Sequence, residues 1–322
     1  MRRTSARFKL ASAVAVTAAA ATFGGITAAG AAEPAAENDI LAVGTPTGFG
    51  AATTGGAGGD TVTVSDADAF IEAASSDGPL QIEVDGTIQL DDMADVSSDK
   101  TIIGVGSGSG FDGSGLHVAD ADNVIIQNLV FANSNDDGIN VQYSTNVWID
   151  HNDFTNPNDG ALDIKRASTD ITVSWNHTYD SDKNMLLGHD DDNASEDVGR
   201  LNVTYHHNWF DGVNQRNPRV RFGDPVHVYN NYYNDIGSYG VASTEDAGVL
   251  VEANYFENTD DPYHLGEGDS GPGSLVAVDN HYESSSEGET GGSVSDIPYS
   301  YTPDAATDVK SIVTGGAGVG NI

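Results

Sequence analysis

The chain has 322 residues, with 49 acidic side chains against 13 lysines and arginines, which gives a formal net charge of −36. A surface of this sign repels nucleic acid and anionic lipid, so the composition excludes both as partners. The absence of cysteine excludes disulfide bonds and thiolate metal sites. The excess of acids over lysines is typical of halophilic proteins, whose self-repulsion is screened over about 3 Å in very concentrated salt.

The N-terminus has the pattern of a cleavable export signal. Four basic residues precede an acid-free run, rich in Ala and Val, that ends at Ala32. The Arg2–Arg3 pair favours the twin-arginine route, and interruptions by Gly and Thr argue against a transmembrane anchor. We expect residues 1–32 to be removed. Residues 33–322 would then form one secreted, extracellular domain, a monomer with no membrane attachment.

The mature chain begins with a predicted helix and continues as a repeated coil. The segment DADAFIEAASSD (66–77) reads as a short amphipathic helix that caps one end of the fold. Seven later segments pair alternating β-branched residues with a terminal Asn, at spacings near 23 residues. These asparagines are Asn128, Asn152, Asn176, Asn208, Asn231, Asn254 and Asn280. The repeat predicts a parallel β-solenoid in which they adopt left-handed geometry and form a hydrogen-bonded ladder.

Two segments depart from the repeat. The acidic stretch GHDDDNASEDVG (188–199) lengthens one interval to 32 residues, and insertions of this kind often emerge on the binding face of a solenoid. The tail after Glu283 is rich in Gly and Ser, and we expect it to return over the surface. No linker indicates a second domain.

Acids gather where two successive coils end. Asp136 and Asp137 end one coil, and Asp159 and Asp163 end the next. In register, these carboxylates would lie on one face about 5 Å apart per layer. Oxygen ligands without Cys or His suit Ca²⁺ rather than Zn²⁺. In so acidic a chain, solvated surface acids remain the alternative.

The scarce bases gather on neighbouring coils. Six of the nine bases beyond residue 32 fall between 165 and 183 or within 216–221. A cationic strip beside a cation site suits a polyanionic substrate, because arginine binds carboxylates through two parallel hydrogen bonds. Ion pairs with the many aspartates are the alternative.

Several motifs occur together in one order. NVWIDHNDF is followed by DGALDIKRASTDITVSWN, then by K-x-x-L-L-G, VTYHHNWF and R-N-P-R-V-R-F-G. This series resembles the pectate lyases of polysaccharide lyase family one, over nearly the whole chain beyond the signal. The resemblance implies an all-β, single-domain, right-handed parallel β-helix. It also implies Ca²⁺ as the cofactor, bound by Asp137, Asp159 and Asp163.

The same resemblance assigns the bases and the reaction. Arg216 matches the catalytic base, and Lys183 and Arg221 match residues that bind the substrate. The implied reaction is β-elimination on polygalacturonate (pectate), in which a proton leaves C5 and the glycosidic oxygen leaves C4, giving unsaturated oligogalacturonides. Arg219 is expected to be a structural ion-pair partner.

Other matched positions are expected to have no part in the chemistry. Asn135 stands where some family members carry a further acid, and Tyr179 stands where many carry His. We interpret His206 and His207 as buried, hydrogen-bonded coil residues. The framework residues implied by the resemblance are Trp148, Asp150 and His151.

Three alternatives remain. A polygalacturonase-like hydrolase on the same fold would need paired acids and a G-H-G segment, whereas residues 188–190 read GHD. A pectin lyase would not keep three acids at the calcium positions. A non-catalytic polysaccharide-binding solenoid would have no reason to keep Lys183, Arg216 and Arg221 together.

Overall fold

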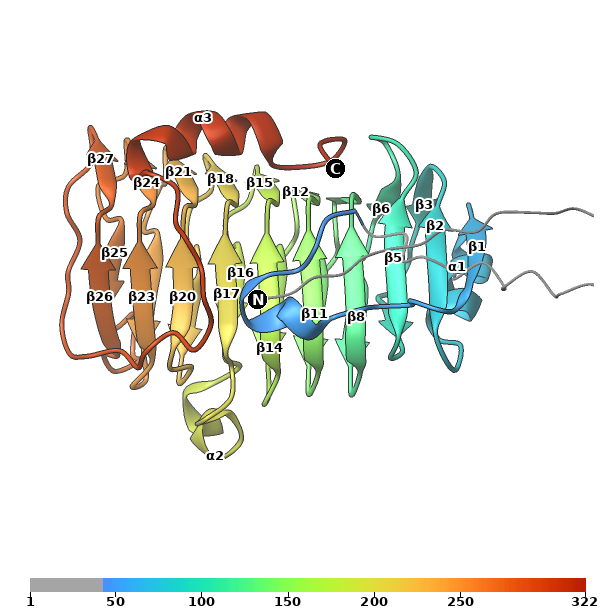
Figure 1. Cartoon of the computed structure of the whole chain (residues 1–322), viewed down its shortest axis with the longest axis horizontal. Helices are drawn as coiled ribbons and strands as arrows, with labels where there is room; N and C mark the ends of the chain where they lie inside the picture. Colours follow the sequence, from blue (N-terminus) through green and yellow to red (C-terminus); the bar gives the residue numbers. More distant parts are fainter. Residues whose placement is uncertain (1–42) are drawn as a thin grey trace, which may run out of the picture. The chain divides into compact units, whose positions relative to one another are not determined.

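The computed structural model describes residues 43–322, so the predicted export signal lies outside the described residues. The described chain is a parallel β-helix in which each coil contributes strands to three sheets (Figure 1). Every strand pairs in parallel with the equivalent strand of the next coil, for example Val147 with Ile171. The all-β parallel solenoid predicted from the repeat is therefore confirmed.

The ten-stranded sheet forms one wall of the helix. Its strands are β1 (Asp60–Val64), β2 (Leu80–Val84), β5 (Lys100–Gly104), β8 (Asp122–Gln127), β11 (Thr145–Asp150), β14 (Thr169–Ser174), β17 (Val203–His206), β20 (Val226–Tyr229), β23 (Gly248–Glu252) and β26 (Ser274–Val278).

The nine-stranded sheet follows it in each coil. Its strands are β3 (Thr87–Gln89), β6 (Gly110–Asp112), β9 (Val130–Ala132), β12 (Asp153–Thr155), β15 (His177–Tyr179), β18 (Trp209–Asp211), β21 (Tyr232–Asn234), β24 (Tyr255–Glu257) and β27 (His281–Glu283).

The eight-stranded sheet completes the coil and carries the candidate site. Its strands are β4 (Ala94–Val96), β7 (Leu116–Ala119), β10 (Ile139–Gln142), β13 (Leu162–Lys165), β16 (Met185–Leu187), β19 (Arg219–Arg221), β22 (Val241–Thr244) and β25 (Tyr263–Leu265). The helices are η1 (Gly48–Ala52), α1 (Ala67–Ala74), η2 (Asp191–Asn193), α2 (Ala194–Asp197) and α3 (Ala306–Gly316).

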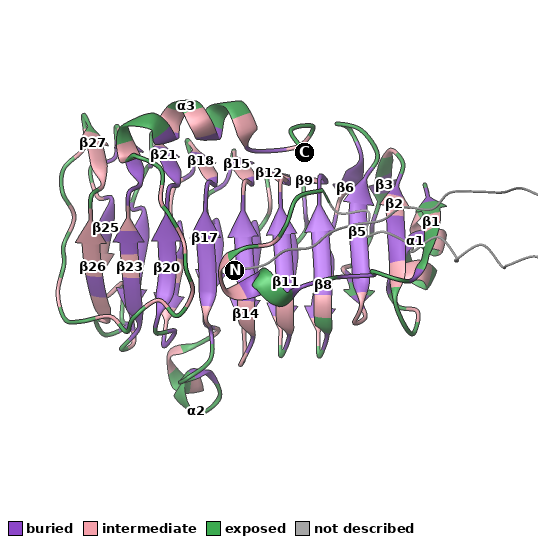
Figure 2. Cartoon of the chain, in the orientation of Figure 1, coloured by how far each residue is buried: buried purple, intermediate pink, exposed green. Residues whose placement is uncertain are grey.

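The core fills the inside of the coil with stacked side chains. The strands are buried along most of their length, and exposure is concentrated at the turns (Figure 2). Phe111, Phe131 and Phe154 occupy equivalent places in three successive coils, with ring centroids 5.6 and 5.0 Å apart. Stacking like residues in register lets each coil bury the apolar face that it could not bury alone.

An asparagine ladder runs through the turns between the ten- and nine-stranded sheets. From Asn152 onward each ladder side chain donates from Nδ2 to Oδ1 of the next, as Asn152 does to Asn176 at 3.0 Å. The predicted ladder is confirmed for six asparagines, with two corrections. The left-handed residue precedes the ladder position, as at His151 (φ 50°). Asn128 itself has φ 58° and lies one residue before the ladder. Because Gln127 pairs with Asp150, the position equivalent to Asn152 in that coil is occupied by Leu129.

Both ends of the described chain cover the solenoid. The predicted capping helix is confirmed as α1, where Asp66 accepts the amide proton of Ala69 and Phe70 is buried against Phe111. The tail after Glu283 returns over the surface as predicted and forms α3, a helix that was not expected from the sequence (Figure 1). Within residues 43–322, no helix is long and apolar enough to span a bilayer.

Candidate active site

The predicted acids come together at the turn that leads into the eight-stranded sheet. Asp136 and Asp137 precede β10, and Asp159 precedes β13 one coil later. Because β10 and β13 pair in register, the turns stack, and the amide of Asp159 donates to the carbonyl of Asp136. One carboxylate oxygen from each of these three residues lies within 4.8 Å of the others. Asp136, which the spacing of the acids had placed on this face, is not among the metal ligands that the family resemblance implies.

Asp163 lies beside this cluster on the outer face of β13. Its side chain is almost fully buried, and Oδ1 has no hydrogen-bond partner among residues 43–322. A Cβ added at Gly160 would lie 2.6 Å from Asp163 Oδ1 and 3.0 Å from Asp137 Oδ1. Both oxygens therefore face the space beside the Gly160 Cα, which is open only because residue 160 has no side chain. Burial, followed by the charge of Asp137, raises the pKa of Asp163 to about 7.

Two lysines neutralise part of this negative charge. Lys165 Nζ lies 2.8 Å from Asp163 Oδ2 and 3.2 Å from Asp137 Oδ2. Lys183 Nζ lies 2.6 Å from Asp159 Oδ1, so the predicted substrate lysine directly contacts a predicted metal ligand. Lys165 was not among the predicted site residues. Its place two residues after Asp163, on the same face of a strand, is the signal that could have found it.

The arginines lie on β19 and just before it, two coils beyond the acids on β13. Arg216 has φ 64°, and its carbonyl accepts the amide proton of Met185 at 2.6 Å. Its Nε is buried and has no hydrogen-bond partner in the described part of the chain. Arg216 lies close enough to Asp163 to draw down the carboxyl pKa that burial and Asp137 raise. The chain therefore brings Arg216 toward the acid cluster.

The other two arginines are held by protein groups. Arg219 Nη2 donates to the Glu267 carbonyl at 3.1 Å and to Ser270 Oγ at 2.7 Å. Among the described residues Arg219 therefore forms no ion pair, and the predicted ion pair is wrong there, because a carbonyl and a hydroxyl take the place of the carboxylate. Arg221 Nε donates to Asp191 Oδ1 at 2.6 Å, and its Nη1 to the Gly188 carbonyl at 3.2 Å. Both of these partners lie in the acidic insertion.

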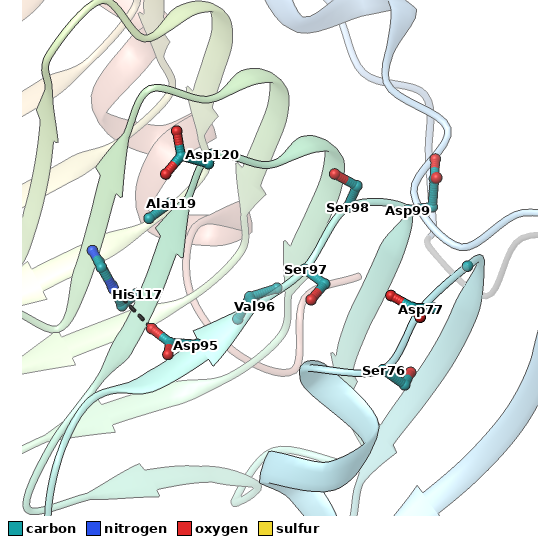
Figure 3. Close-up of a pocket in the computed structure, with 11 residues that line it drawn as sticks. Ser76, Asp77, Asp95, Val96, Ser97, Ser98, Asp99, His117, Ala119 and Asp120 are labelled. Carbon is teal, nitrogen blue, oxygen red and sulfur yellow. Dashed lines mark hydrogen bonds and ion pairs between the residues drawn. The ribbon is translucent and has the colours of Figure 1, made fainter.

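A hollow nearer the N-terminal cap is a poorer site. It encloses about 480 Å³ between the end of α1 and strands β4 and β7 (Figure 3). Four aspartates line it, and the single basic side chain, His117, is bound to Asp95 at 2.9 Å. This lining repels an anionic ligand, whereas the outer faces of β13 and β19 offer both acids and bases.

The residues predicted to lack a chemical role have structural partners. His206 and His207 are buried and joined through their Nδ1 atoms at 2.9 Å, and His207 also contacts Asp304. The Asn135 amide is engaged by the turns of earlier coils, because it accepts from Ser114 Oγ and donates to the Asp91 carbonyl. The residues expected to belong to the framework also have structural partners, with Trp148 donating to Ser174 and Asp150 contacting His151.

This arrangement offers two kinds of chemistry on one face. Four carboxylates without sulfur or imidazole among them suit a hard cation such as Ca²⁺. The neighbouring lysines and arginines suit a ligand that carries carboxylates.

The fold and this site define a parallel β-helix protein with acids and bases along one sheet, and comparison with known proteins identifies its family. A family model described as pectate lyase matches residues 5–322. The pectate trisaccharide-lyase of Bacillus licheniformis is 38% identical over 293 residues, covering 84% of each chain. Pectate lyase plyB of Emericella nidulans is 36% identical over 279 residues, 83% of this chain and 85% of its own. The chain therefore belongs to the pectate lyase family and is a polysaccharide lyase.

Solved structures agree with this assignment. A pectate lyase from a Bacillus species, in complex with trigalacturonate, has a TM-score of 0.78 at 33% identity and covers 86% of this chain and 99% of its own. Pectate lyase II from Xanthomonas campestris has a TM-score of 0.72 at 27% identity and covers 86% of this chain and 98% of its own.

Proposed function

We propose that this lyase cleaves polygalacturonate by calcium-dependent β-elimination at the face formed by β10, β13, β16 and β19. The single observation that carries the proposal is the stacking, in successive coils, of the turns that carry the acids, Lys183 and Arg216, which would put a base beside a cation site. The substrate class is supported by the relative that was solved with trigalacturonate.

The acid cluster fits calcium. The carboxylate oxygens of Asp136, Asp137 and Asp159 converge within 4.8 Å, and Asp163 Oδ1 is buried with no hydrogen-bond partner from the residues that the structure describes. Such oxygens match the ligands of Ca²⁺, and we propose that these four aspartates would hold it. When bound, Ca²⁺ would supply positive charge that makes the proton at C5 of a galacturonate more acidic.

The remaining roles belong to basic side chains of this chain. Lys183 and Arg221 bind the substrate carboxylate and stabilise the negative charge that develops on it. Arg216 removes the C5 proton. The electron pair of the broken C5–H bond forms a double bond between C4 and C5, the C4–O bond breaks, and the leaving oxygen takes a proton from solvent.

The N-terminal residues complete the proposal. We infer that residues 1–32 direct export and that the mature protein acts outside the cell as a monomer, in concentrated salt. The pattern of bases followed by an acid-free apolar run supports the signal, and the acid excess supports the salt adaptation. Amino-terminal sequencing of protein recovered from culture medium tests the export.

The activity is tested by mixing the protein with polygalacturonate in high salt, with Ca²⁺ or with a chelator. A rise in ultraviolet absorbance that requires Ca²⁺ is expected, because elimination leaves a double bond conjugated with the carboxylate. New reducing ends without the absorbance rise would indicate the polygalacturonase-like hydrolase instead. Neither signal, together with measurable binding of the polymer, would indicate the non-catalytic solenoid.

A further inference from the structure

We propose that Asp191, in the acidic insertion after β16, is a positioning residue that holds Arg221 with its Nη2 atom free for a substrate carboxylate. The inference rests on the proposed function, because it takes Arg221 as a substrate-binding residue. Asp191 belongs to the insertion at residues 188–199, which is recognisable in the sequence as acidic extra length within one coil.

A short chain of polar contacts links Asp191 to both arginines of β19. Asp191 Oδ1 accepts from Arg221 Nε at 2.6 Å. Ser270 Oγ lies 2.7 and 2.8 Å from the two Asp191 oxygens, and it accepts from Arg219 Nη2 at 2.7 Å. One aspartate and one serine therefore fix Arg219 and Arg221 relative to each other, although Ser270 lies in the loop between β25 and β26.

The far end of the insertion is anchored as well. Asp197 is buried, and its Oδ1 accepts the amide proton of Ala167 at 2.7 Å. Glu196 lies 3.7 Å from Arg166 and also accepts from the Tyr143 hydroxyl. The insertion is therefore tied to earlier coils at one end and to later coils at the other, so that Asp191 is presented by a braced segment.

The contacts leave one atom of Arg221 available. Nε donates to Asp191 and Nη1 donates to the Gly188 carbonyl, while Nη2 has no partner among residues 43–322 and is not buried. The Arg221 side chain is only 11% exposed, so the guanidinium has little freedom to turn toward a ligand. A fixed guanidinium with a free Nη2 loses less entropy when a carboxylate binds.

A competing interpretation is that Asp191 occupies the place of a substrate carboxylate and must be displaced. Three observations oppose it. Ser270 binds both Asp191 oxygens, Arg221 offers Nε rather than its free Nη2, and the hydrogen bond from Ser270, followed by the contact with Arg221, lowers the pKa of Asp191. An acid held in this way is a fixed part of the site.

The two interpretations predict opposite results when the acid is removed. An aspartate beside a site for a polyanion repels the substrate, so charge alone predicts that Asp191→Ala tightens binding. Positioning predicts that the same change weakens binding, because Arg221 then loses its fixed orientation. The neighbouring Asp192 makes no side-chain hydrogen bond or ion pair among the described residues, so Asp192→Ala is a control with an identical change of charge.

The test compares Asp191→Ala, Asp191→Asn and Asp192→Ala with the wild type. We expect Asp191→Ala to raise KM for polygalacturonate about tenfold and to change kcat less than about twofold, because one charged hydrogen bond to the substrate is weakened. Asp191→Asn keeps an oxygen acceptor for Arg221 and should raise KM less. In an Arg221→Ala background, Asp191→Ala should add no further rise, since its effect passes through Arg221.

The affinity for trigalacturonate, measured by calorimetry on the same proteins, gives a readout that does not need turnover. A tenfold loss that is absent in Asp192→Ala and in the Arg221→Ala background supports the proposal. A KM or affinity equal to that of Asp192→Ala, a tighter complex, or a loss that persists in the Arg221→Ala background overturns it. A wild type that binds trigalacturonate without eliminating it would refute the proposed function alone.

Discussion

Calcium binding to the acid cluster is expected to weaken as the pH falls, because Asp163 takes up a proton. Burial and the charge of Asp137 raise the pKa of this carboxyl to about 7, and burial and Asp137 also raise that of Asp136. A cation bound by Asp163 needs the ionised form. At pH 5.5, ionising a group of pKa about 7 costs about 2 kcal/mol, so the affinity should be about 30-fold weaker than at pH 8.

Isothermal titration calorimetry with Ca²⁺ at the two pH values measures this difference. Buffers with different heats of ionisation should reveal close to one proton released per ion at pH 5.5 and fewer at pH 8. The variant Asp163→Asn should bind Ca²⁺ more weakly, with a shallower dependence on pH. Equal wild-type affinities at both pH values, or an unchanged slope in Asp163→Asn, would refute the reasoning.

The Asp163 carboxyl also makes the free energy of unfolding of the calcium-free protein depend on pH. A raised pKa means that the fold favours protonated Asp163, so this contribution is complete below the pKa of an unfolded aspartate, about 4. It is lost as the pH rises through about 7. The gain in melting temperature on adding Ca²⁺ to chelator-treated protein should therefore be larger at pH 8 than at pH 5.

Other changes test the base, the substrate lysine and the ladder. Arg216→Lys should lower kcat by about 10²–10⁴ while KM changes little, and an unchanged kcat would remove Arg216 from proton transfer. Lys183→Ala should raise KM at least about tenfold, because charge-assisted hydrogen bonds contribute about 1.5–3 kcal/mol, and an unaltered KM would contradict its contact with substrate. Asn176→Ala should cost about 4 kcal/mol in denaturant unfolding, since it leaves buried partners on Asn152, Asn208 and Ile149 unsatisfied. The exposed control Asn321→Ala should cost less than about 0.5 kcal/mol, and equal losses in the two variants would argue against a stabilising ladder.

The coil could be predicted from the sequence because its signals repeat. Alternating β-branched residues and an Asn once per coil give a period that stacking requires, and six ladder asparagines follow it. Asn128 misled the prediction because Asn also suits the left-handed residue before the ladder position. A single sequence does not distinguish these two neighbouring places, which pairing with the next coil determines.

Only those site residues whose positions follow from the backbone register of stacked coils could be predicted from the sequence. Stacked turns bring Asp137 and Asp159 together, and the same register places Asp136 with them. The partners of Arg221 and Arg219 depend instead on the paths of two long loops, which no periodicity describes. For this reason the contact between Asp191 and Arg221 and the replacement of an ion pair at Arg219 emerge only from the structure.

A crystal structure of the Arg216→Lys variant with Ca²⁺ and an oligogalacturonate tests the central claim most directly. We expect an ion bound by carboxylate oxygens of Asp136, Asp137, Asp159 and Asp163. We also expect a uronate carboxylate on Lys183 and Arg221, with the C5 hydrogen facing residue 216. An ion elsewhere on the chain, or a sugar whose C5 faces away from residue 216, would contradict the account.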